Sequence, residues 1–360
     1  MRIGILTFHR AHNYGAVLQC YALQQYLKAQ GHEVYVIDYN NKHLWADYSW
    51  RDRNSEKEMR ENIFKFPVRL LHYLKIKRRE IIRYCKFVIF QEHILALANI
   101  ESIYKRPYDL ILIGSDQVWN TNITMGLDPY YWGVFDRPSS TKVATYAASL
   151  RALWEEKDYK FIHHALQMLD GISVRESAVG QYVKNLFPDL MVSCVPDPVF
   201  LLPAHQWLSF AKIPAYKKPY AFFYQAERSE VVYNTACEIS SKFGLPLIVL
   251  SADARARNSK ECHSASPQEF IGWIQNADLV ITSSFHALAF SIIFQKDFYA
   301  INLNKGKDER LNSILSLFGL EERLVDNVNM CKVMKPHYNT EAMNLLRTAA
   351  CDFINQVIMK

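Results

Sequence analysis

His286 is the residue whose type and position most clearly suggest chemistry. Histidine changes charge near neutral pH and often acts as a general acid or base. It follows the apolar, β-branched run Leu279–Thr282, which is typical of a strand buried in a parallel sheet. Ser283 and Ser284 suit the N-cap of the mostly apolar helix that continues from His286. The pattern places His286 at the carboxyl end of a parallel strand, where α/β sheets bind ligands and a helix N-terminus attracts anions. A packed or surface histidine is the alternative.

A second strand end carries a carboxylate, an indole and an amide. Asp116, Trp119 and Asn120 follow the buried run of residues 108–114. Such a set can bind a sugar, since sugars are held by hydrogen bonds and a stacked aromatic face. An equal alternative makes Asp116 a helix N-cap and Trp119 a core residue.

Cationic side chains occur at two further positions. Arg175 follows a short strand that begins at Gly171, and its planar guanidinium suits a phosphate or a carboxylate. A structural ion pair with Glu176 is an equally good explanation for Arg175 at this position. A basic loop supplies further cations near His286, although a solvated loop is the commoner explanation; its members are Lys305, Lys307 and Arg310.

The loop of residues 9–15 precedes a helix near the start of the chain. It contains His12, Asn13, Tyr14 and Gly15, which together suit an anion or a sugar. The loop lacks the repeated glycines of a dinucleotide-binding fingerprint or a P-loop, so neither cofactor is supported.

The chain that holds these residues alternates short apolar strands with amphipathic helices, which predicts an α/β fold. Its 360 residues favour two domains. A proline-rich stretch from 195 to 219 marks the boundary and is expected to be irregular. We predict one domain over 1–205, a second over 206–335, and a closing helix over 336–360 that can cross back to the first domain.

Composition narrows the class of protein. Half of the residues are hydrophobic, and 42 Lys and Arg against 36 Asp and Glu give a net charge of +6, too little to favour nucleic acid. The seven cysteines are scattered without the spacing of a zinc site, so we predict no metal and reduced thiols. No export signal or membrane-spanning run is apparent, which predicts a cytoplasmic protein. Residues 40–99 are expected to be charged and helical; a solvated face is the main interpretation, and peripheral contact with anionic lipid is the alternative.

Several segments together resemble the polysaccharide pyruvyl transferase family from residue 1 to about 325. They are TFHRAHNYGAVLQCYALQQYL, YDLILIGSDQVWN, ATYAASL, GISVRES, VPDPVFLL and ADLVITSSFHALAFSIIF. The resemblance implies two Rossmann-like domains facing a cleft, similar to the GT-B glycosyltransferase fold. It also implies transfer of the enolpyruvyl unit of phosphoenolpyruvate onto two hydroxyls of a sugar in a cell-surface or capsular polysaccharide precursor, with release of phosphate and no further cofactor.

The resemblance assigns roles to individual residues. The family's histidine falls on His286 and its arginine on Arg175, both associated with phosphoenolpyruvate. Many members carry an arginine where this chain has Ser284. Either Lys305, Lys307 or Arg310 supplies the missing charge, or the serine marks a different donor geometry. The residues expected to bind phosphoenolpyruvate are Arg175, Ser284, Lys305, Lys307 and Arg310.

We expect His286 and Asp116 to be catalytic and the second domain to hold the donor. The acceptor, a free or lipid-linked sugar, would lie on the first domain against His12, Asn13, Tyr14, Gly15, Trp119 and Asn120. Two other functions fit the sequence: a GT-B glycosyltransferase that uses a nucleotide sugar, and a non-catalytic carbohydrate-binding relative.

Overall fold

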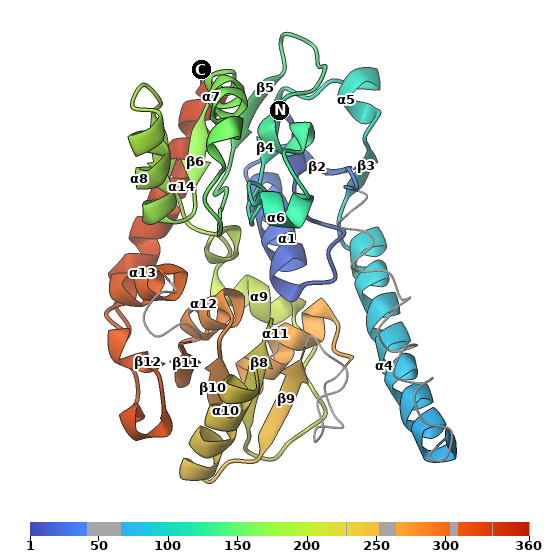
Figure 1. Cartoon of the computed structure of the whole chain (residues 1–360), viewed down its shortest axis with the longest axis vertical. Helices are drawn as coiled ribbons and strands as arrows, with labels where there is room; N and C mark the ends of the chain where they lie inside the picture. The colour runs from blue at the N-terminus through green and yellow to red at the C-terminus, as the bar shows by residue number, and fades with distance from the viewer. Residues whose placement is uncertain (42–65, 228, 252–263, 303–308, 333, 360) are drawn as a thin grey trace.

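The protein has two α/β units, each built on a five-stranded parallel sheet (Figure 1). The computed structural model describes residues 1–41, 66–227, 229–251, 264–302, 309–332 and 334–359. The strands are short and apolar on both faces, as expected where helices cover a parallel sheet on both sides.

The first sheet has the order β3-β2-β1-β4-β5. A small parallel pair, β6 and β7, continues from it through bridges between Ala144 and Gly171 and between Ala148 and Val174. The bounds are β1 (Arg2–Leu6), β2 (Glu33–Asp38), β3 (Leu97–Asn99), β4 (Leu110–Ile113), β5 (Lys142–Thr145), β6 (Ile172–Val174) and β7 (Val192–Cys194).

Helix α1 opens the first unit between β1 and β2, and Asn13 caps it by accepting hydrogen bonds from the Gly15 and Ala16 amides. The helices of this unit are α1 (Tyr14–Ala29), α4 (Phe66–His93), α5 (Ser102–Lys105), α6 (Thr121–Thr124), α7 (Tyr159–Gln167) and α8 (Ser177–Leu186).

The second sheet has the order β12-β11-β10-β8-β9. Its strands are β8 (Ala221–Gln225), β9 (Leu247–Ser251), β10 (Leu279–Thr282), β11 (Phe298–Ile301) and β12 (Leu324–Val325). The accompanying helices are α9 (Ala204–Phe210), α10 (Glu230–Lys242), α11 (Pro267–Asn276), α12 (Phe285–Ile293) and α13 (Glu309–Phe318). Ser266 and Glu269 form a reciprocal capping box that fixes the start of α11.

The two units share apolar packing, and one buried cluster contains residues of both sheets and of the last helix. Tyr14 of α1 stacks on Phe270 of α11 and donates a hydrogen bond to the Ala265 carbonyl at 2.7 Å. Helix α14 (Thr340–Met359) runs beside the first unit, where Lys142 Nζ donates to the Ile358 carbonyl at 2.9 Å. Figure 1 shows α14, in red, reaching from α13 to the level of α7.

One expectation about local structure was wrong, and one segment had no prediction. The proline-containing segment predicted to be irregular includes α9, because Pro203 occupies the N-cap position, where a missing N–H costs no helical hydrogen bond. The segment between Arg175 and the proline turn, for which the sequence predicted no element, forms α8 and β7.

Candidate active site

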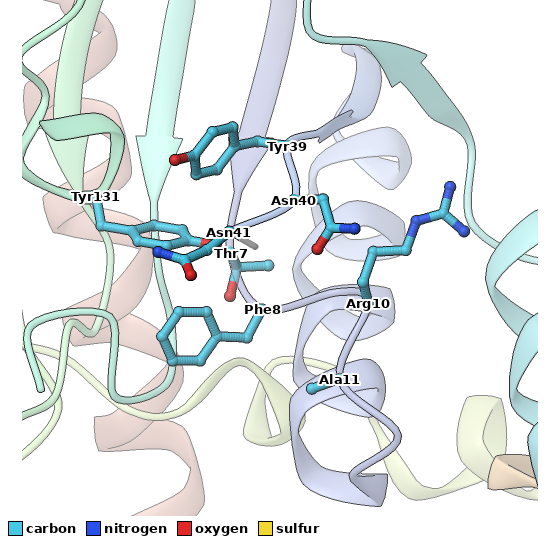
Figure 2. Close-up of a pocket in the computed structure, with 8 residues that line it drawn as sticks. All are labelled: Thr7, Phe8, Arg10, Ala11, Tyr39, Asn40, Asn41 and Tyr131. Carbon is cyan, nitrogen blue, oxygen red and sulfur yellow. The ribbon is translucent and has the colours of Figure 1, made fainter. Parts of the chain in front are cut away.

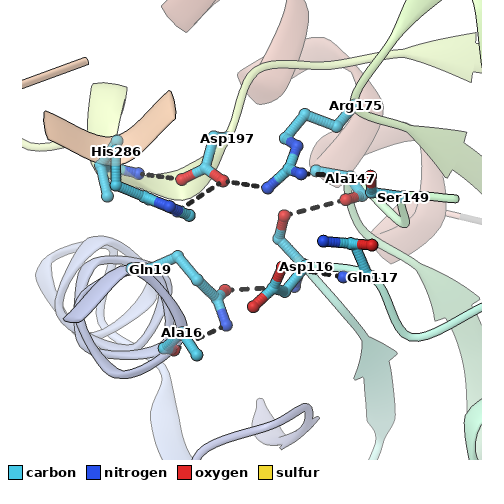
Figure 3. Close-up of polar contacts among 12 residues, drawn as sticks. Ala16, Gln19, Asp116, Gln117, Ala147, Ser149, Arg175, Asp197 and His286 are labelled. Carbon is cyan, nitrogen blue, oxygen red and sulfur yellow. Dashed lines mark hydrogen bonds and ion pairs between the residues drawn. The ribbon is translucent and has the colours of Figure 1, made fainter. Parts of the chain in front are cut away.

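The carboxyl ends of several strands meet between the two units. Arg175 follows β6, Asp197 lies in the turn after β7, and His286 lies in the first turn of α12 after β10. The strand, the helix and the position predicted for His286 are therefore confirmed. Figure 3 shows Asp197 between the other two side chains, with Asp116 and Ser149 nearby.

Arg175 is buried and bonded by three of its nitrogens. Nε donates to Glu176 Oε1 at 2.8 Å, Nη1 to Asp197 Oδ2 at 2.8 Å, and Nη2 to Ser149 Oγ at 3.1 Å. Burial lowers the pKa of the guanidinium, but Glu176, Asp197 and other nearby carboxylates outweigh this and raise the pKa above its usual value. Arg175 is thus a fixed positive charge that already takes part in a buried ion-pair network.

Asp197 connects Arg175 to His286. Its Oδ2 lies 3.4 Å from His286 Nε2, which is longer than a normal hydrogen bond, and its Oδ1 accepts from the Val199 amide at 3.1 Å. Burial raises the pKa of Asp197, but His286 and Arg175 together lower it to about 2. The carboxylate is therefore ionised, and it can orient the imidazole and stabilise its protonated form.

Gly15 lets α1 approach the His286 ring. A Cβ built on Gly15 would lie 2.5 Å from His286 Cγ and nearer still to Nδ1 and Cε1, well inside van der Waals contact. Gly15 was predicted to bind the acceptor. The structure places it against His286, and its lack of a side chain creates the space that the imidazole occupies; its role in acceptor binding stays a prediction.

The N-terminus of α12 is not capped by a side chain. Ser284 occupies the N-cap position, yet its hydroxyl makes no capping hydrogen bond, which corrects the expectation for this residue. The buried hydroxyl of Ser283 has no partner among the described residues. Uncapped N–H groups at a helix N-terminus attract anions, so this end of α12 is a candidate phosphate or carboxylate site.

A cavity of about 320 Å³ lies beside this network. Its charged lining residues are Arg175, Glu176, Asp197 and Arg310, whereas most of the other lining residues are apolar and come from both units and from α14. Phe285 also lines the cavity, and its ring lies under the Arg175 guanidinium, with Arg175 Cζ 4.8 Å from the ring centroid. The structure therefore brings Arg175 and Arg310 to one cavity.

A smaller hollow lies at the carboxyl ends of β1 and β2 (Figure 2). Its volume is about 10 Å³, roughly the room needed by one water molecule. The side chains around it include Phe8, Tyr39 and Tyr131, but the hollow cannot hold a sugar ring in this conformation. The larger cavity is the better candidate for a substrate site.

Asp116 lies close to the network. Its charge contributes to the raised pKa of Arg175, and its carbonyl accepts a hydrogen bond from the Ser149 amide at 3.0 Å. Its φ of 78° is unusual for a residue other than glycine, and such conformations cluster at functional sites. The carboxylate accepts from the Gln117 amide at 2.9 Å rather than capping a helix.

Other predicted acceptor residues have structural partners instead. Trp119 is only 1% exposed and stacks on Trp132, so its ring offers no face to a sugar and the core alternative is correct. Asn120 caps α6 through the Asn122 amide. Asn13 caps α1, and the Tyr14 ring is buried between the two units.

His12 also belongs to the packing. It is buried and stacks on Phe87 of α4, with ring centroids 5.2 Å apart. Burial, followed by the charges of Arg83 and Arg10, lowers its pKa to about 4. The loop of residues 9–15 therefore packs against α4, and its role in binding an anion or a sugar stays a prediction.

Sequence reasoning missed Asp197 and Glu176. For Asp197, the Pro-Asp-Pro turn after a strand was a signal for a site residue. For Glu176, the signal was its possible ion pair with Arg175, which was considered only as an alternative to a ligand site. Lys305 and Lys307 lie outside the described residues.

Comparison with solved structures defines the class of fold. UDP-GlcNAc 2-epimerase from Methanocaldococcus jannaschii is similar over 100% of this chain and 99% of its own, with a TM-score of 0.51 and 12% identity. The corresponding enzyme from Rickettsia bellii has a TM-score of 0.49 and 10% identity, and the similarity covers 99% of this chain and 96% of that enzyme. The calicheamicin glycosyltransferase CalG4 has a TM-score of 0.37 and 11% identity, and the similarity covers 99% of this chain and 94% of CalG4. The predicted fold, two Rossmann-like units similar to GT-B, is confirmed.

The family follows from the sequence. A family model for polysaccharide pyruvyl transferase matches residues 13–305, which include Asp116, Arg175, Asp197 and His286. The chain therefore belongs to the polysaccharide pyruvyl transferase family, and the resemblance noted from its segments is confirmed. No curated protein matches the sequence.

Proposed function

We propose that this family member transfers the enolpyruvyl unit of phosphoenolpyruvate onto two hydroxyls of a sugar in a polysaccharide precursor. The observation that carries the donor assignment is the uncapped N-terminus of α12 beside the Arg175–Asp197–His286 network. Phosphoenolpyruvate is small and highly anionic, so its carboxylate and phosphate need several positive partners.

Several groups around the cavity can bind the anionic donor. The α12 amides and Arg310 supply hydrogen-bond donors and charge for the phosphate or carboxylate. Arg175 supplies a nearby positive charge whose geometry is fixed by its partners. Arg310 lines this cavity and is the described member of the basic loop proposed to compensate for the arginine that this chain lacks at Ser284.

His286 is the proposed acid for the first step. A proton is added to the methylene carbon, which leaves an oxocarbenium-like centre at the neighbouring carbon. One sugar hydroxyl and then the second form C–O bonds to that centre, while the bond from it to the phosphate oxygen breaks. Of the two hydroxyl protons, one replaces the proton given by the enzyme and the other leaves with phosphate.

Two carboxylates are candidates to take a hydroxyl proton. Asp116 is the one that the sequence suggested, and it lies near Arg175. Glu176 lines the cavity, and its buried Oε2 has no hydrogen-bond partner among the described residues. A buried acceptor atom without a partner is costly, so a substrate hydroxyl or a water is expected to satisfy it.

A ligand-dependent thermal shift tests the donor assignment. Phosphoenolpyruvate at about 100 times its Kd should add about 2.7 kcal/mol to the free energy of unfolding, a shift of a few degrees. Inorganic phosphate should give a smaller shift, and Arg310→Gln should reduce the shift from phosphoenolpyruvate. Arg106→Gln is the matched control, because Arg106 is exposed on the first unit. Stabilisation by a UDP-sugar alone would favour the glycosyltransferase alternative.

A further inference from the structure

Helix α4 exposes an apolar stripe that the proposed chemistry does not use. Leu74, Ile81, Ile82 and Ile89 are 53%, 46%, 36% and 56% exposed, and Cys85 on the same face is exposed as well. At 3.6 residues per turn these side chains fall within an arc of about 100°. Figure 1 shows α4 as a long helix along one side of the molecule, with its amino-terminal end level with β9.

The opposite face of α4 is held by the rest of the protein. Phe87 and Phe90 are buried, and Lys86 pairs with Glu269 of α11 at 2.6 Å. Arg83 Nη2 donates to the His12 carbonyl at 3.0 Å. The exposed stripe is therefore fixed in orientation and faces away from the two units.

The charge of the protein is concentrated on this helix. Residues 66–93 contain seven Lys and Arg and two Glu, a formal balance of +5, compared with +6 for the whole chain. Arg78 is exposed within the stripe, and Lys77, which pairs with Glu80 at 3.0 Å, lies beside it. No helix in the described part of the chain is long and apolar enough to span a membrane.

We propose that α4 binds the surface of an anionic membrane, lying in the plane of the headgroups with its apolar stripe inserted. A central apolar stripe flanked by basic residues is the arrangement found in interfacial helices. The positive charge complements anionic lipid, and each Lys or Arg near such a surface adds attraction. A protein groove would match the apolar residues but would not by itself account for the flanking charge.

The site and the proposed membrane surface are connected through one loop. The inner face of α4 contacts His12, and Phe87 packs on Tyr14, with ring centroids 5.0 Å apart; the next residue, Gly15, contacts His286. A membrane-bound α4 would thus hold the active site near lipid-borne acceptors. This consequence depends on the proposed function, whereas vesicle binding does not.

Vesicle sedimentation of the full chain tests the proposal. Binding to vesicles containing about one third phosphatidylglycerol in phosphatidylcholine is expected, with much weaker binding to phosphatidylcholine alone and weakening by salt. Ile81→Ser with Ile89→Ser should weaken binding at least tenfold. Arg78→Gln should weaken it about fivefold. Ile213→Ser with Val231→Ser is the matched control, because both residues are strongly exposed elsewhere.

Three results would overturn the proposal. One is no binding to anionic vesicles by a protein that unfolds cooperatively. Another is equal loss of binding in the control variant. The third is dimerisation without lipid that Ile81→Ser with Ile89→Ser abolishes, because the stripe would then be a contact between two copies of the chain.

Discussion

Replacing Gly15 with alanine tests whether α1 sets the position of His286. The added Cβ would lie 2.5 Å from His286 Cγ and nearer still to Nδ1, whereas carbon atoms in contact are normally about 3.5–4.0 Å apart, so the ring must move by at least about 1 Å. Displacements of this size in a catalytic site can cost about 100-fold in rate. We expect a loss of about that size in phosphate release from phosphoenolpyruvate.

Stability measurements separate this steric effect from an effect on the helix. Alanine favours a helix over glycine by up to about 1 kcal/mol, so in a His286→Ala background Gly15→Ala should stabilise the protein. With His286 present, the same substitution should be neutral or destabilising, which gives a measurable coupling energy between the two sites. Gly180→Ala in α8, where the nearest atom to an added Cβ is Val174 Cγ2 at 3.3 Å, is the control. Equal effects of Gly15→Ala in both backgrounds, together with full activity, would refute the reasoning.

Two further predictions concern buried titratable groups. Asp197→Asn should lower the free energy of unfolding at neutral pH by about 3–5 kcal/mol, because Arg175 loses a buried partner. Since the pKa of Asp197 is lowered to about 2, that difference should shrink as pH falls from about 4 to 2; a constant difference in denaturant titrations would contradict the assignment. The pKa of His12 is lowered to about 4, so the folded protein favours its neutral form. The free energy of unfolding should therefore fall by up to about 3 kcal/mol as pH falls from about 6.5 to 4. His12→Phe should keep the stacking on Phe87 and flatten this pH dependence, and an unchanged slope would show that other groups cause it.

The sequence predicted the elements around His286 because local patterns determine them. The β-branched run of β10 and the apolar helix that follows are visible within about twenty residues, and so is the strand end at Arg175. The two-unit α/β architecture follows from the same alternation of patterns and agrees with the observed parallel sheets.

The contacts of these residues could not be predicted from local sequence patterns. Asp197 meets His286 only after both units have folded, and no local period connects positions 89 residues apart. Trp119 could equally have been a sugar platform, and only its stacking on Trp132 and its edge contact with Trp154 place it in the core. Asn13 and Asn120 illustrate the same ambiguity, because polar residues after strands serve as helix caps as readily as ligands.

In the proposed reaction, the enolpyruvyl unit of phosphoenolpyruvate is transferred to a sugar, and the transfer needs His286. The most direct measurement follows phosphoenolpyruvate labelled with ¹³C at its methylene carbon by NMR, with free and lipid-linked sugars as acceptors. We predict that the methylene signal is replaced by the methyl signal of a ketal, with equimolar release of phosphate, and that His286→Ala abolishes the conversion while remaining folded. An unchanged rate in that variant, or consumption of a nucleotide sugar in place of phosphoenolpyruvate, would contradict the account.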